Sequence, residues 1–177
     1  MRVLTCYPYR MLFLTKKENR RWLTVTSAEY NFMDFITWLN DHAEYVILWG
    51  YEGLPEQIHG GDVDIFIRPE DYDSVVEELH RRGYSSATCP HYNSKHKHEQ
   101  LSREGDYTLH LCDSFCFTIK EKTYLLILHH NYILRHKRFI SFWVADPMTT
   151  AFLTALRVIA GRKDCMTRLK KFLDEIK

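Results

Sequence analysis

The sequence predicts a single domain of the α+β class, in which helices cover a mixed, mainly antiparallel β-sheet. Short apolar runs of strand length, such as residues 45–49, are separated by polar turns that contain glycine. Between these runs lie longer segments whose apolar residues recur at helical spacing. A chain of 177 residues with 45% hydrophobic and 27% charged residues is long enough for one well-formed core. We therefore expect one domain over residues 1–177.

The N-terminal part predicts strands followed by a helix. Two apolar runs, residues 3–9 and 11–15, could form a hairpin, and residues 22–25 read as a further short strand. Ser27 is a favourable helix N-cap, and apolar residues recur every three or four positions from there to Ala43. This helix leads into the strand expected at residues 45–49 and opens a core that we expect over about residues 27–113.

The middle of the chain predicts a strand, a helix and a hairpin. Aspartates alternate with aliphatic residues at the start of the strand expected from Asp62. Pro69 favours the first turn of a helix, and Gly83 favours its end. Three strands are then expected, and a turn at residues 104–106 joins the last two: residues 84–89, 98–103 and 107–112.

The last third of the chain predicts a helical extension over about residues 146–177. Residues 124–130 could be helix or strand, and residues 139–144 are expected to be one extended segment. Asp146 and Pro147 are favourable residues for the start of a helix, which we expect Gly161 to end. We expect Asp164 to cap the final helix.

Two carboxylates at the start of a strand are the strongest functional signal. Strand side chains alternate between faces, so Asp62 and Asp64 share one face while Val63 and Ile65 point into the core. Two adjacent carboxylates repel each other, and a divalent cation between them relieves that repulsion. Oxygen ligands on a half-open site suit Mg²⁺ or Mn²⁺, which also bind phosphate oxygens.

The segment from Val46 to Ile67 resembles the nucleotidyltransferase fold superfamily, of the polymerase-β-like or minimal nucleotidyltransferase type. An apolar strand ends at Gly50, a loop of roughly ten residues follows, and Gly61 precedes Asp62 and Asp64 in an aliphatic strand. Residues 49–55 and 61–65 are similar to the corresponding segments of an uncharacterised bacterial subgroup of that superfamily. The superfamily usually has Gly-Gly or Gly-Ser after the first strand, whereas this chain has Gly50-Tyr51.

The resemblance implies Mg²⁺-dependent transfer of a nucleoside monophosphate from a nucleoside triphosphate to a hydroxyl group of a small molecule, a sugar or a protein. Asp62 and Asp64 would hold the metal, and Gly50 with Tyr51 would lie beside the phosphates. A third carboxylate is usual on a neighbouring strand. His110 occupies the expected position, Asp113 lies one residue after the strand, and Asp106 lies one residue before it.

Cationic side chains would be needed to neutralise the phosphates of such a substrate. Lys95, Lys97 and Arg103 precede the strand that carries His110 and are the candidates for phosphate contact. Solvated loop charges are at least as good an interpretation of these three residues.

Two further classes of function stay open. The first is a nucleotidyltransferase-fold binding module without catalysis, or one half of a toxin–antitoxin-like pair, with aromatic residues such as Tyr51, Tyr92 and Trp143 serving recognition. The second is a nucleic-acid binder that uses two basic segments, residues 16–21 and 135–138. The net charge of +1 gives no global argument for nucleic acid as a partner.

Composition limits the remaining possibilities. No apolar run reaches the roughly 20 residues that a membrane-spanning helix needs. Five scattered cysteines favour reduced thiols and a cytoplasmic location. The spacing of the nearby zinc-type ligands matches no compact motif: Cys89, His91, His96, His98, Cys112 and Cys116. The aromatic-rich N-terminal segment could form the surface of a homodimer.

Overall fold

The structure is a computed structural model that describes residues 27–49, 51, 53–55, 62–87, 97–104, 107–119, 122–126, 130–161 and 165–176. The hairpin, the strand and the basic segment predicted within residues 1–26 lie outside this part of the chain. The same holds for several single residues named above: Gly50, Gly61, Cys89, His91, Tyr92, Lys95, His96, Asp106 and Asp164.

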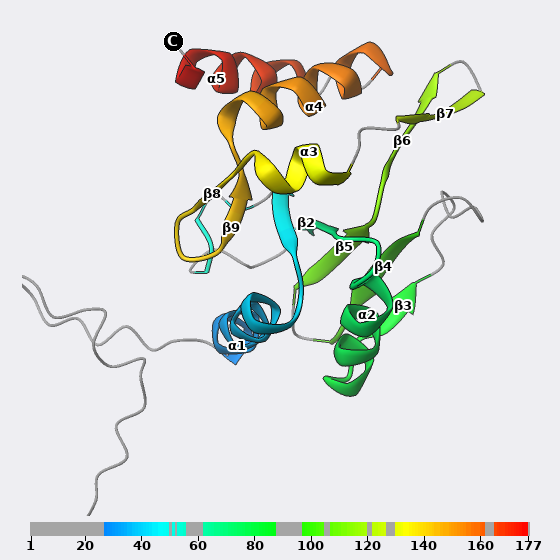
Figure 1. The fold of residues 1–177 in the computed structure, drawn as a ribbon, viewed down its shortest axis with the longest axis vertical. Coiled ribbons are helices and arrows are strands. Elements are labelled where there is room, and N and C mark those ends of the chain that lie inside the picture. The colour runs from blue at the N-terminus through cyan, green and yellow to red at the C-terminus, as the bar shows by residue number, and fades with distance from the viewer. Residues whose placement is uncertain are drawn as a thin grey trace, which may run out of the picture.

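Within these ranges the chain forms five helices and nine strands. The helices are α1 (Ser27–His42), α2 (Tyr72–Arg81), α3 (His130–Arg135), α4 (Pro147–Ile159) and α5 (Met166–Ile176). The strands are β1 (Tyr45–Trp49), β2 (Asp62–Ile67), β3 (Ser85–Ala87), β4 (His98–Ser102), β5 (Thr108–Cys112), β6 (Phe115–Ile119), β7 (Lys122–Leu126), β8 (Lys137–Phe139) and β9 (Trp143–Ala145). Figure 1 shows α1 and α2 on one side of the strands, and α3, α4 and α5 on the other.

Seven strands form one mixed sheet in the order β3-β4-β5-β2-β1-β9-β8, and β6 pairs with β7 in a separate hairpin. Of the six neighbouring pairs in the large sheet, β2 with β5 and β1 with β9 are parallel, and the other four are antiparallel. The predicted α+β class with a mixed, mainly antiparallel sheet is confirmed. Strand β2 lies at the centre, between β5 and β1.

One face of the sheet packs against α1 and α2. Four side chains of α1 at positions i, i+3, i+4 and i+7 are buried there: Phe32, Phe35, Ile36 and Leu39. They belong to the same core cluster as Val63, Ile65 and Ile67 of β2. The aliphatic residues that alternate with the two aspartates therefore point into this core, as the sequence predicts.

The opposite face packs against α3 and α4. Its core cluster contains Phe66 of β2 and Phe115 of β6, whose rings stack with their centres 5.5 Å apart. Ile133 of α3 and Leu153 of α4 are buried in the same cluster. Since Asp62 and Asp64 share the strand face of Phe66, the aspartates lie on the side of the sheet that the C-terminal helices cover.

Strand β1 has a bulge between Ile47 and Trp49. Ile47 pairs with Ile65, but Trp49, and not Leu48, pairs with Asp64. A bulge inserts one extra residue and changes the face to which the following side chain points. Trp49 therefore joins the core cluster on the face of the aspartates, to which its neighbour Leu48 also belongs.

Gly83 ends α2 as the sequence predicts, whereas Pro69 does not begin it. Gly83 has a φ of +87° and donates to the carbonyl of His80, while Tyr84 donates to the carbonyl of Leu79. These two bonds form a Schellman motif, which a left-handed residue at this position allows. At the other end, Pro69 does not occupy the first turn of α2. The helix begins at Tyr72 after a turn, and the carboxylate of Asp71 in that turn binds Arg68 and the backbone N–H of Glu44.

The C-terminal helical extension is present with the predicted cap. Asp146 accepts a hydrogen bond of 2.6 Å from the backbone N–H of Thr149, and Pro147 begins α4. Gly161 follows the end of α4 with a φ of +97°. No helix among the described residues combines the length and the apolar character that crossing a membrane requires.

Three predicted segments differ from the structure. Residues 139–144 are not one extended strand but parts of β8 and β9 with a tight turn between them, in which Phe142 is buried and Ile140 is exposed. The ambiguous stretch 124–130 is strand β7 as far as Leu126, and α3 begins at His130. The strand expected at 84–89 is described only as β3, from Ser85 to Ala87.

Candidate functional site

Asp62 and Asp64 lie at the start of β2, at the centre of the sheet. They point to the same face, because they are two residues apart and Val63 between them is buried in the opposite core. The Asp62 side chain is 60% exposed, whereas Asp64 is half-buried. No hydrogen bond from the described residues reaches either carboxylate. The pair therefore forms an open, negatively charged end of the strand.

His110 of β5 lies beside the two aspartates. Strands β2 and β5 are parallel, and their register pairs Asp64 with His110. The His110 Nε2 atom lies 3.7 Å from a carboxylate oxygen of Asp62, which is beyond hydrogen-bond length. This ring nitrogen is buried and has no hydrogen-bond partner among the described residues. The ring packs edge-on against His98 of β4, with centres 5.8 Å apart.

Arg157 approaches the aspartates from α4. Its guanidinium carbon lies 4.0 Å from the centre of the Trp49 ring, which is a close cation–π contact. Trp49 is buried, and its indole N–H donates a hydrogen bond of 3.2 Å to the hydroxyl of Thr154, also on α4. Because Trp49 pairs with Asp64 across the bulge, the stacked guanidinium lies near the aspartate end of β2.

The surroundings of Asp64 act on its protonation in opposing directions. Burial raises the pKa of Asp64 above its ordinary value, and this is the largest influence. Arg157 and His110 lower the pKa of Asp64. The charge of Asp62 raises it again, and Arg168 of α5 lowers it by a smaller amount. The net result is a carboxyl group that holds its proton more strongly than an exposed aspartate does.

Asp113 is not part of this group. Its carboxylate accepts hydrogen bonds from the backbone N–H of Lys97, at 2.9 Å, and from the hydroxyl of Ser114, at 2.8 Å. It follows β5 at the end away from Asp62, which pairs with Thr108 at the beginning of that strand. Asp113 therefore closes the turn after β5, and His110 is the predicted third residue that lies with the aspartates.

Lys97 and Arg103, which the sequence offers for phosphate contact, lie against α2 and its C-terminal end. The Lys97 ammonium forms an ion pair with Asp73 and lies 5.5 Å from the ring centre of Tyr72. The Arg103 guanidinium donates a 2.7 Å hydrogen bond to the carbonyl of Arg82. Both side chains thus contact elements on the opposite side of the sheet from Asp62.

Tyr51 is also placed differently from the role proposed for it. It is buried among the side chains that pack against α1 and α2, and its carbonyl accepts a hydrogen bond from the backbone N–H of Leu54. A buried core side chain fixes the start of the loop after β1. It does not supply an exposed aromatic surface for recognition.

The donor set at the aspartates fits a hard divalent cation that takes part of its coordination shell from a substrate. Two carboxylates on one face offer the oxygen ligands that Mg²⁺ and Mn²⁺ prefer. No group of three or more histidine, cysteine, aspartate or glutamate side chains within the described part of the chain could hold a metal ion. A cation at Asp62 and Asp64 would therefore need phosphate or water oxygens as further ligands.

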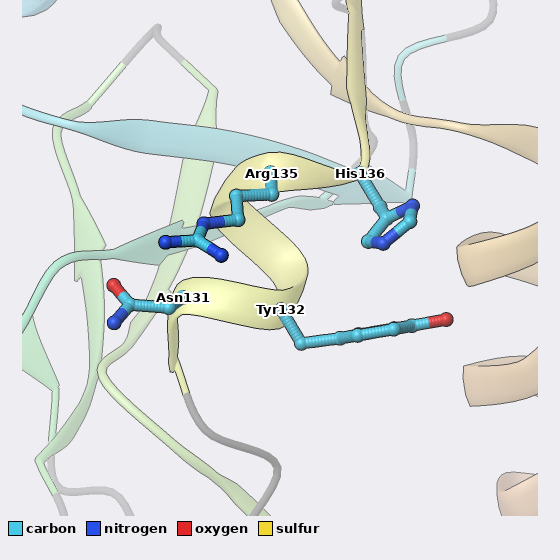
Figure 2. Close-up of a pocket in the computed structure, with 4 residues that line it drawn as sticks. All are labelled: Asn131, Tyr132, Arg135 and His136. Atoms are coloured by element: carbon cyan, nitrogen blue, oxygen red, sulfur yellow. The ribbon is translucent and has the colours of Figure 1, made fainter.

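The second basic segment, residues 135–138, is divided by the structure. His136 contacts Asp146 at 3.4 Å, and Lys137 forms an ion pair with Glu44 at 3.5 Å. Arg135 lies at the end of α3 and, with Asn131, Tyr132 and His136, lines a pocket of about 370 Å³. Figure 2 shows Arg135 and Asn131 pointing to one side of α3, and Tyr132 pointing to the other. Two of the four basic residues thus contact carboxylates, while Arg135 and Arg138 are exposed.

Sequence reasoning missed Arg157 and the role of Trp49. Arg157 lies at the end of a predicted amphipathic helix, where a basic residue is ordinary. Trp49 ends a predicted apolar strand, and nothing in the local pattern reveals the bulge that turns its ring toward α4. Both depend on how a strand and a helix about a hundred residues apart pack together.

Comparisons of the chain with protein-family models, with curated proteins and with solved structures found no match.

Proposed function

We propose that the chain binds a nucleoside triphosphate together with a divalent cation at Asp62 and Asp64, and that it transfers a nucleoside monophosphate to a hydroxyl group. The cation would be Mg²⁺ or Mn²⁺. The resemblance of residues 46–67 to the nucleotidyltransferase superfamily supports this reaction class, and the α+β architecture is compatible with it.

The observation that carries the proposal is a contrast in hydrogen bonding. Asp62, Asp64 and His110 converge on one face of the sheet, and none of them has a hydrogen-bond partner in the described part of the chain. The carboxylates of Asp71 and Glu78 are instead held by arginines. Buried polar groups are normally hydrogen-bonded. The buried Nε2 of His110 and the half-buried carboxylate of Asp64 have no such partner in the described part of the chain and lie beside the exposed Asp62, which favours a ligand site.

The transfer step has a defined balance of bonds. The hydroxyl oxygen of the acceptor forms a bond to the α-phosphorus, the bond from that phosphorus to the bridging oxygen breaks, and pyrophosphate leaves. Nε2 of His110 accepts the hydroxyl proton, since an imidazole can act as a base at neutral pH. A bound cation would polarise the phosphate oxygens and neutralise the charge of the leaving group. Asp62 and Asp64 would hold that cation.

A second candidate is a binding module that holds the nucleotide without transferring it. The placement of Asp113 favours this alternative, because that carboxylate is engaged in the turn after β5. The usual third carboxylate of the superfamily then has no counterpart among the described residues near Asp62, and only His110 remains as a base.

Nucleotide binding is tested first by thermal shift with each of the four nucleoside triphosphates and Mg²⁺. We expect the melting temperature to rise for the wild type and to rise less, or not at all, for Asp62→Asn/Asp64→Asn. The matched control is Asp41→Asn. It replaces an exposed aspartate of α1, the helix that packs on the face of the sheet opposite Asp62 and Asp64. No rise with any nucleotide would contradict the proposal.

Transfer is tested by pyrophosphate release in the presence of sugar, small-molecule and protein acceptors. Release by the wild type, together with retained nucleotide binding but lost release in His110→Asn, would support catalysis with His110 as the base. Nucleotide binding with no release from any of these acceptors would favour the binding module.

A further inference from the structure

We propose that Arg157 is the residue that binds the phosphate chain of the nucleotide, with Trp49 as the platform that positions its guanidinium group. The substrate class is a nucleoside di- or triphosphate, whose terminal phosphates would lie against α4. This inference rests on the proposed function, and it assigns phosphate recognition to the C-terminal helices and not to the loop after β1.

The guanidinium group of Arg157 is held in place by stacking. It lies 4.0 Å from the ring centre of Trp49, and that ring is itself fixed by the hydrogen bond to Thr154. The Thr154 hydroxyl in turn donates a 2.7 Å bond to the carbonyl of Thr150. A stacked guanidinium keeps its N–H groups available in the plane of the group, which is the geometry of bidentate phosphate binding.

The N–H groups of Arg157 have no hydrogen-bond or ion-pair partner among the described residues, although the residue is half-buried. The other half-buried arginines of the described residues do have partners. Arg68 binds Asp71, Arg82 binds Glu78 and Arg103 binds the carbonyl of Arg82. Guanidinium donors without a partner in the described part of the chain, held over the Trp49 ring, favour an anionic ligand.

The position of Arg157 fits a phosphate that a cation at the aspartates would also contact. Trp49 and Asp64 are directly paired across β1 and β2, and such neighbours have Cβ atoms roughly 5 Å apart. Arg168 of α5 adds a second positive charge that acts on Asp64. The α4–α5 extension thus contributes two arginines on the side of the sheet where the aspartates lie.

The loop after β1 is poorly suited to phosphate contact through its first side chain. The superfamily pattern would place glycine or serine where this chain has Tyr51, and Tyr51 is buried in the core against α1 and α2. Arg157, the described cation that stacks on the residue opposite Asp64, offers a phosphate-binding group from another element.

A simpler role for Arg157 is that of a counter-charge to Asp64. The two roles predict different results. A counter-charge would affect stability and would act on all ligands of the site alike, whereas a phosphate-binding residue would distinguish nucleotides by the number of their phosphates.

The test is calorimetric titration of the full chain with ATP, GTP, CTP and UTP and with the matching nucleoside monophosphates, all with Mg²⁺. The variants are Arg157→Gln, which keeps a flat amide over the indole, and Arg157→Lys, which keeps the charge. The control is Arg138→Gln, which removes an exposed arginine of β8. Circular dichroism checks that each variant is folded.

We expect Arg157→Gln to weaken triphosphate binding roughly 10–100-fold, the effect of losing charge-assisted hydrogen bonds, and to change monophosphate binding much less. Arg157→Lys should lie between the wild type and Arg157→Gln, because an ammonium group lacks the planar fork. Arg138→Gln should bind like the wild type.

Equal triphosphate affinity in the wild type and Arg157→Gln would overturn the inference and leave the proposed function standing. An equal loss for monophosphates and triphosphates would also overturn it, because the phosphate chain would then not be what Arg157 recognises. Absence of any nucleotide binding by the wild type, with intact folding, would instead refute the proposed function and this inference with it.

Discussion

Individual carboxylates in this protein fall into two groups that the sequence cannot tell apart. Glu78 is buried and accepts hydrogen bonds from two arginines, which lower its pKa. Asp71 is bound by Arg68 and by a backbone N–H. Asp62 and Asp64 have no such partners in the described part of the chain. The first group stabilises the fold, whereas the second carries the proposed ligand site.

Replacing Asp64 by asparagine should stabilise the folded protein in the absence of ligand. Burial raises the pKa of Asp64, so the folded state binds a proton there more readily than the unfolded chain does. Above that raised pKa the ionised carboxylate therefore destabilises the fold. This cost shrinks as the pH falls through the folded pKa toward the ordinary value of 3.8.

The measurement is thermal unfolding of the wild type and Asp64→Asn between pH 4 and pH 7. We expect the variant to melt a few degrees higher at pH 7 and the difference to vanish near pH 4. Asp41→Asn, an exposed position, provides the control. A lower melting temperature for Asp64→Asn at pH 7 would contradict a destabilising charge at this position.

The sequence predicts the two aspartates and His110 of the candidate site, but it does not predict Arg157. The shared face of Asp62 and Asp64 follows from the two-residue period of a strand. The place of His110 follows from expecting its strand beside β2. Arg157 could not be found, because its significance depends on a long-range contact with Trp49 and not on any local pattern.

At the scale of secondary structure, two glycines end helices in the left-handed conformation. Gly83 has a φ of +87° and Gly161 a φ of +97°. A Cβ atom on Gly83 would lie 3.5 Å from the Arg103 side chain, an ordinary contact, and one on Gly161 would meet nothing within 4 Å. The requirement for glycine is therefore conformational at both positions and not a matter of space.

Gly83→Ala and Gly161→Ala should each lower the free energy of unfolding by about 1–2 kcal/mol, the cost of a left-handed L-residue. Gly83→Asn should lose less, because asparagine tolerates this conformation better. Chemical denaturation of the three variants measures these differences. If Gly83→Ala were as stable as the wild type, the Schellman motif would not be contributing as described.

Local sequence signals predict the helices of this chain more accurately than its short strands. Caps such as Asp146 act through neighbouring atoms and are visible in the sequence. Strands β8 and β9 have only three residues each, and the side chain of Phe142 at the turn between them is buried in the core. A run of apolar and aromatic residues gives no sign of such a reversal, because its composition favours an extended strand throughout.

At the scale of the whole molecule, the sheet separates two cores that share its central strands. Ile47 of β1 belongs to the core beneath α1 and α2, and its neighbour Leu48 belongs to the core beneath α3 and α4. A disturbance of either core is therefore transmitted to the other through β1, and we expect one cooperative unfolding transition.

Ile47→Ala and Leu48→Ala should each destabilise the protein by about 2–5 kcal/mol, as is usual for such truncations in a core. Urea unfolding followed by circular dichroism and by tryptophan fluorescence should give coincident curves for both variants. Ile159→Ala is the control, since that side chain is 68% exposed. Separate transitions for the two probes would show that the C-terminal helices unfold independently.

The single extra residue in β1 has a consequence for protein engineering. Without the bulge, regular alternation would turn the Trp49 ring toward α1, and Arg157 would lose the surface on which it stacks. A redesign that idealised this sheet by pairing Leu48, in place of Trp49, with Asp64 would produce a more regular strand. We expect it to discard the proposed phosphate contact while leaving both aspartates in the sequence. Keeping the two aspartates would then not be sufficient to keep the proposed activity.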